Sequence, residues 1–162
     1  MEINKQLFDI DSLFDLTNDL TITAETFRRF AAIELLYRKS DPSRLQDVLD
    51  DIFSTSRCIC LRGQENPEEF KLLQNGLSKV RSFIHSENYG IDSAIANASK
   101  AAYLSKLIEK GISKVHHFTS GNEQELAGAV ITDPLPTKFN KFKKSNVEAF
   151  FYWNEIQKLI LL

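Results

Sequence analysis

Residues 91–111 read IDSAIANASKAAYLSKLIEKG, and they carry the clearest signal of fold class in the sequence. Its bulky apolar residues recur three or four positions apart, which is the spacing of one face of an α-helix. Five alanines between positions 94 and 102 leave room for a neighbouring helix to approach closely. Gly111 follows as a typical left-handed helix terminator. The stretch therefore predicts a long helix that packs against other helices.

Outward from this stretch, the same periodicity predicts five further helices. They cover residues 3–17, 23–39, 41–63, 66–86 and 145–162. Ser145 and Glu148 have the spacing of a capping box, in which each side chain bonds a free backbone N–H at the start of the last helix. Glycines and prolines replace the helical pattern in residues 112–144. We therefore expect an all-α bundle of about six helices, with an irregular connector near 112–144, in a single domain over residues 1–162.

Two of the predicted helices are apolar on most of their sides. For residues 23–39 this pattern predicts a helix at the centre of the bundle. In residues 145–162 the pattern exceeds what one side of a monomeric bundle covers, so we expect self-association or a protein partner at the C-terminal helix. Glu34 lies among apolar residues and needs an arginine, such as Arg38 or Arg57, or contact with solvent. The alternative for Glu34 is a functional carboxylate in a cleft.

Composition and charge exclude several classes of protein. The chain has 162 residues, 43% of them hydrophobic, and its 20 basic and 22 acidic side chains give a net charge of −2. It is therefore neither a disordered tail nor a protein that binds phosphate backbones over its whole surface. The sequence has no leader pattern and no run of about 20 apolar residues, so we expect a cytoplasmic protein without a membrane segment. Cys58 and Cys60 are expected to be buried free thiols.

One local segment is strongly basic. Residues 138–144 place two phenylalanines among four cations, and the candidate RNA-binding residues are Lys138, Lys141, Phe142, Lys143 and Lys144. Lysines that bind phosphates together with rings that stack on bases are typical of single-stranded nucleic-acid sites. The alternative, which we favour, is that the two rings anchor the segment in the core while the lysines stay hydrated.

The sequence offers no metal or nucleophile motif. His85, His116 and His117 lack the spacing of metal ligands. Asp9, Asp11 and Asp15 do not all share one helix face, so surface acids or ion pairs are the expected outcome. We therefore expect no catalytic residue, no metal and no cofactor in this chain. An enzyme with a cleft around Glu34 and Tyr37 is the remaining catalytic alternative.

The segment Lys5-Gln6-Leu7-Phe8-Asp9-Ile10 resembles one that opens the helical C-terminal region of AbiEii/AbiGii-type abortive-infection nucleotidyltransferase toxins. Residues 48–53 and 143–153 are also similar to that region. The resemblance pairs Asp9 with the last acid of the family segment and Lys5 with its leading base. Gln6 departs from the family, in which an acid stands at this position, and the chain lacks the Gly-Ser motif and α/β pattern of the catalytic domain.

The resemblance implies a non-catalytic helical domain of a toxin system, whose catalytic domain would bind Mg²⁺ and NTP. Its implied roles are to position an acceptor such as tRNA or to pack on a nucleotidyltransferase domain, and an antitoxin is a further implied partner. Two-metal nucleotidyl transfer needs several converging carboxylates, which Asp9 cannot supply alone. The alternative function is a stand-alone helical interaction or oligomerisation domain.

Overall fold

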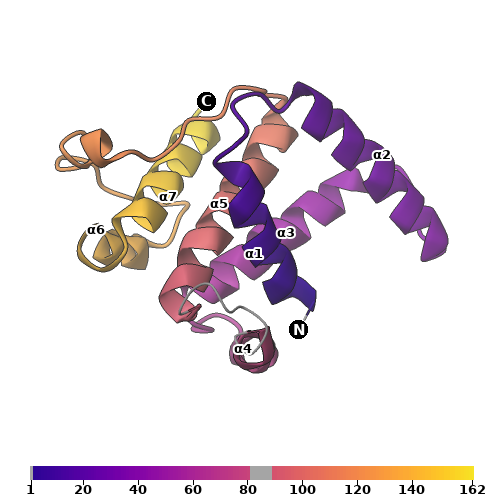
Figure 1. The fold of residues 1–162 in the computed structure, drawn as a ribbon, viewed down its shortest axis with the longest axis horizontal. Coiled ribbons are helices and arrows are strands. Elements are labelled where there is room, and N and C mark those ends of the chain that lie inside the picture. The colour runs from indigo at the N-terminus through magenta and orange to yellow at the C-terminus, as the bar shows by residue number, and fades with distance from the viewer. Residues whose placement is uncertain (1, 81–88) are drawn as a thin grey trace.

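The chain folds as a bundle of α-helices (Figure 1). The computed structural model describes residues 2–80 and 89–162, and within them the chain forms seven α-helices and no strand. The helices are α1 (Glu2–Phe14), α2 (Thr21–Tyr37), α3 (Leu45–Cys60), α4 (Pro67–Val80), α5 (Ile91–Lys110), α6 (Phe142–Ser145) and α7 (Val147–Ile160), with 3₁₀ turns at Ser120–Glu123 and Thr137–Lys141. The predicted all-α bundle and the irregular connector are confirmed. The end of the helix expected over residues 66–86, and His85, lie outside the described residues.

Helix α5 is the central element, as its alanines predict. It packs against α1, α3 and α7. Ala98 and Ala102 are fully buried, because their small side chains let the neighbouring helices come close. Gly111 ends the helix in the left-handed conformation, with a φ of 66°. The core of the domain therefore surrounds the stretch that dominates the sequence pattern.

Helix α2 is not central, and the prediction for residues 23–39 is wrong. It projects from the edge of the bundle, on the opposite side of α5 from α7 (Figure 1). Only Ala24 and Ala31 of this helix are buried. A helix that is apolar on most sides is normally covered by other protein segments, but the pattern does not specify whether these segments belong to the same chain. Within the described part of the chain, the buried Ala24 of α2 belongs to a small satellite core with Leu49 and Ile108.

Helix α7 is covered by its own chain, so the apolar surplus expected from its aromatic residues is wrong, although Leu161 and Leu162 after the helix are exposed. Phe150, Phe151, Tyr152 and Trp153 are each at most 2% exposed. The connector supplies much of the cover, since the ring of Phe139 stacks on Trp153 with 4.1 Å between centroids. Residues that resemble a spacer in sequence are thus part of the core.

The start of α7 differs from the predicted capping box. Asn146 is the N-cap, and its side-chain oxygen accepts a hydrogen bond of 3.1 Å from the backbone N–H of Ala149. Ser145 is the last residue of α6, and its hydroxyl donates to the carbonyl of Lys141. Glu148 bonds a lysine of α5 instead. The box fails because a short helix occupies the residues before the cap.

Candidate interaction site

Helix α2 exposes an apolar surface to solvent. Its large apolar side chains between 59% and 88% exposed are Ile22, Phe30, Ile33, Leu36 and Tyr37, which we call the outer face of α2. At about 100° per residue, the five positions fall within an arc of about 120° and therefore lie along one side of the helix. The exposed ion pair of Glu34 with Arg38, at 4.0 Å, confirms the expected i, i+4 partner for Glu34. An apolar helix face of this extent is typical of a protein contact.

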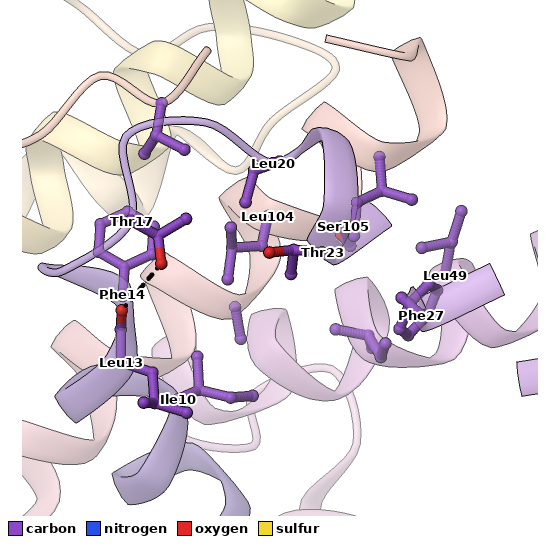
Figure 2. Close-up of a pocket in the computed structure, with 14 residues that line it drawn as sticks. Ile10, Leu13, Phe14, Thr17, Leu20, Thr23, Phe27, Leu49, Leu104 and Ser105 are labelled. Atoms are coloured by element: carbon purple, nitrogen blue, oxygen red, sulfur yellow. Dashed lines mark hydrogen bonds between the residues drawn. The ribbon is translucent and has the colours of Figure 1, made fainter. Parts of the chain in front are cut away.

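A groove lies on the other side of α2, between that helix, α1 and α3. One end of it, the α1/α5 hollow, has a volume of about 240 Å³ (Figure 2). The lining side chains include Ile10, Leu13 and Phe14 of α1, Phe27 of α2, Leu49 and Ile52 of α3, and Ala101, Leu104 and Ile108 of α5. Helices from four parts of the chain therefore form one apolar recess.

Most of the hydroxyl groups that line this recess already form hydrogen bonds within the protein. Thr17 donates to the carbonyl of Leu13 at 3.2 Å, as Figure 2 shows, and Ser105 donates to the carbonyl of Ala102 at 2.8 Å. Thr23 lies at the exposed rim. The floor of the α1/α5 hollow thus offers apolar contact and little hydrogen bonding.

The groove continues into two wider hollows. The α1/α3 hollow, of about 430 Å³, shares Ile10, Leu13 and Phe27 with the α1/α5 hollow. The α2/α3 hollow, of about 680 Å³, shares Phe27 and Asp51 with the α1/α3 hollow. Asp9, which the resemblance marks, lines the α1/α3 hollow from α1. Lys5 is exposed and lines none of the three.

A charged cluster around the buried Lys100 holds the α1 wall of this groove on the core. The ammonium of Lys100, whose side chain is 4% exposed, lies 2.7 Å from Asp11, 2.9 Å from Glu148 and 3.3 Å from Asp15. Burial alone would lower the pKa of Lys100, but the hydrogen bonds with Asp11 and Glu148 outweigh it and raise the pKa above its usual range. The cluster joins α1, α5 and α7 and keeps the lysine charged.

Sequence reasoning missed this cluster, although it predicted ion pairs for the acids of α1. Asp11 and Asp15 are four positions apart and therefore share a helix face, and Lys100 is the one cation among the alanines of α5. These two signals could have suggested a pairing between the helices. Nothing in the sequence joins them to Glu148, which lies in α7.

The candidate RNA-binding segment is split between core and solvent. Phe142 is buried, and its ring stacks on Phe139 with 5.7 Å between centroids, so it is not accessible to a base. Lys143 lies over the ring of Phe150, and Lys138 bonds Gln64. Lys141 and Lys144 are exposed. The rings anchor the segment, which is the alternative favoured from sequence, and RNA binding by the lysines stays a prediction.

Both cysteines and two of the histidines, His116 and His117, are held in structural contacts. Cys58 and Cys60 are buried free thiols, as expected, and burial raises the pKa of Cys60 to about 12. His116 contacts Glu155 at 3.1 Å and His117 contacts the carbonyl of Thr17 at 2.8 Å. Among the described residues, no three His, Cys, Asp or Glu side chains form a group that could hold a metal.

Comparison with known proteins finds no matching family model, no matching curated protein and no matching solved structure. Among the described helices, none combines the length and the apolar character that a membrane crossing requires.

Proposed function

We propose that this chain is a non-catalytic helical domain that packs on a second protein through the outer face of α2. The supporting observation is that one 17-residue helix exposes five large apolar side chains while only two of its residues are buried. Burial of apolar area contributes about 25 cal/mol per Å², so covering such a face favours association. Soluble proteins rarely leave a contiguous apolar face of this kind uncovered.

The resemblance to abortive-infection toxins suggests the class of this second protein. This protein would be a nucleotidyltransferase domain. That domain would supply the catalytic acidic residues and would bind Mg²⁺ and NTP, which this chain is not expected to bind. Self-association is the alternative, and the exposed apolar residues favour α2 over the buried α7 as its surface. An antitoxin at the same face, or tRNA held beside the catalytic domain, would extend the proposal.

The test uses a double variant of the outer face, Ile33→Glu with Leu36→Glu. A matched control makes the same change at exposed leucines outside α2, Leu72→Glu with Leu161→Glu; these side chains are 73% and 69% exposed. The tagged chain is used to isolate a partner from a lysate of its native cells. The partner is then purified and remixed with each variant, and the mass of the complex is measured by light scattering.

The proposal expects a stoichiometric complex with a protein that carries a Gly-Ser motif and paired acids. That complex should be lost in the α2 variant and kept in the control. A complex that persists in the α2 variant contradicts the proposal. So does wild-type chain that forms no complex, while a dimer of the chain alone would support the oligomerisation alternative.

A further inference from the structure

We infer that the groove between α1, α2 and α3 binds an amphipathic helix of the partner, with a large apolar anchor residue flanked by lysine or arginine. The inference rests on the proposed interaction function, but it assigns a second surface with its own residues. The outer face of α2 consists of Ile22, Phe30, Ile33, Leu36 and Tyr37, and of these only Phe30 also lines the groove. The two surfaces can therefore be disabled separately.

The walls of the groove determine the backbone form of its occupant. Helices α1, α2 and α3 bond their backbone groups internally, so they offer no strand edge with which an extended peptide could pair. A bound segment must therefore satisfy its own N–H and C=O groups. A helix does so, and helices that lay an apolar face into a groove are a common mode of recognition.

The α1/α5 hollow determines the anchor residue. Its volume of about 240 Å³ exceeds the cavity of about 150 Å³ that holds benzene in an engineered protein core. A leucine, phenylalanine or tryptophan side chain therefore fits as one inserted group. Because Thr17 and Ser105 bond backbone carbonyls, an apolar side chain leaves neither hydroxyl unpaired.

The charges around the groove determine the flanks of the bound helix. The charged residues that line the three hollows are two arginines, Arg38 and Arg44, and four acids. Arg38 pairs with Glu34, and Arg44 pairs with Asp47. The two remaining carboxylates belong to Asp9 and Asp51 of the α1/α3 hollow. Neither makes an ion pair or a side-chain hydrogen bond with the described part of the chain.

These two acids give the groove a net charge of −2 beside an apolar floor. Complementary cations on a bound helix would pair with both of them. The same charge opposes a nucleic-acid strand in this groove, because its phosphates would face Asp9 and Asp51. The chemistry therefore favours a cationic amphipathic helix.

The experiment uses three fluorescent 18-residue peptides with the full chain. The first has leucines at helical spacing, one central phenylalanine and flanking lysines. The second replaces the lysines by glutamates, and the third replaces the phenylalanine by alanine. Binding is measured by fluorescence anisotropy at two salt concentrations. We expect the lysine peptide to bind about tenfold more tightly than either of the others, and less tightly at high salt.

Two variants of the protein test the groove itself. Asp9→Asn with Asp51→Asn should weaken binding of the lysine peptide about fivefold to tenfold and reduce its salt dependence. Asp50→Asn is the control, since Asp50 is exposed on the same helix as Asp51 but lines no hollow. Leu13→Glu should abolish binding, and Leu16→Glu is its control; both leucines are more than 60% exposed, so the fold tolerates the change.

The outcomes separate this inference from the proposed function. The Ile33→Glu, Leu36→Glu variant should bind the lysine peptide as the wild type does, even if that variant has lost the partner. Equal binding of the lysine and glutamate peptides, or unchanged binding by the Leu13→Glu variant, overturns the inference. Absence of binding at millimolar peptide overturns it too. A dimer that Leu13→Glu dissociates would assign the groove to a second copy and would also overturn it.

Discussion

The ammonium nitrogen of Lys100 lies 2.9 Å from a carboxylate oxygen of Glu148, and this contact joins the central helix α5 to α7. Asp11 of α1 and Asp15, which directly follows that helix, complete the cluster around Lys100. The lysine is buried, whereas the side chains of Asp11 and Glu148 keep about a third of their surface in solvent. The cluster is therefore a structural joint between three helices, one of which forms a wall of the groove.

Replacement of this lysine should destabilise the domain. Lys100→Met keeps the length of the side chain but leaves three carboxylates without their cation, so we expect a loss of about 2–3 kcal/mol in the free energy of unfolding. Denaturation in urea, followed by circular dichroism, measures it. Lys110→Met is the control, because Lys110 is exposed at the end of the same helix and its loss should cost less than about 0.5 kcal/mol. Equal effects of the two variants would contradict the role of the cluster.

The N-cap of α7 provides a second prediction. Asn146→Ala removes the bond to the backbone of Ala149 and also a bond of 2.9 Å that the Asn146 amide donates to the carbonyl of Asp92. We expect Asn146→Ala to lower the free energy of unfolding by about 1–2 kcal/mol. Ser145→Ala should change it by less than about 0.5 kcal/mol. Calorimetry measures both variants. If Ser145→Ala lost more free energy of unfolding than Asn146→Ala, the result would support the capping box predicted from sequence and contradict the Asn146 cap.

Two glycines with positive φ should differ in their tolerance of alanine. At Gly111 an added Cβ meets no atom within 4 Å, so Gly111→Ala should cost only the left-handed strain of about 1 kcal/mol. At Gly63, whose φ is 74°, the same Cβ would lie 2.4 Å from the Cβ of Phe70. We therefore expect Gly63→Ala to be the more destabilising by at least about 1 kcal/mol in parallel urea titrations. The reverse order would show that α4 shifts freely away from α3.

Alkaline solution should destabilise the domain through its buried tyrosines. Burial raises the pKa of Tyr103 to about 12, although the His116 backbone N–H, 3.4 Å from its oxygen, partly opposes this. Folded Tyr103 keeps its proton at a pH where the unfolded chain has lost it. Its contribution to stability is therefore complete below about pH 10 and is lost as the pH rises toward about 12.

The free energy of unfolding, measured between pH 8 and pH 11.5, should fall at the alkaline end by about 1–2 kcal/mol for this group. Tyr103→Phe should reduce the slope without removing it, because burial also raises the pKa of Tyr152. An identical slope in the variant would exclude Tyr103 as a contributor.

Local sequence signals predict all the described α-helices except the short α6. Their periodicity, the proline at the start of α4 and the glycine after α5 are local signals, because a helix is built from contacts among residues within a few positions of one another. The buried thiols, the pair of Glu34 with Arg38, and the anchoring role of the rings in residues 138–144 follow from similar short-range arguments.

Which of the two apolar helices is covered depends on the packing of the whole chain. The patterns of α2 and α7 are alike, yet α7 is buried under the connector and α2 is left exposed. The reason is that burial depends on where distant segments lie, and the stacking of Phe139 on Trp153 has no trace in either local pattern. The same holds for the groove, because Asp9 and Asp51 come together only when α1 and α3 pack on α5.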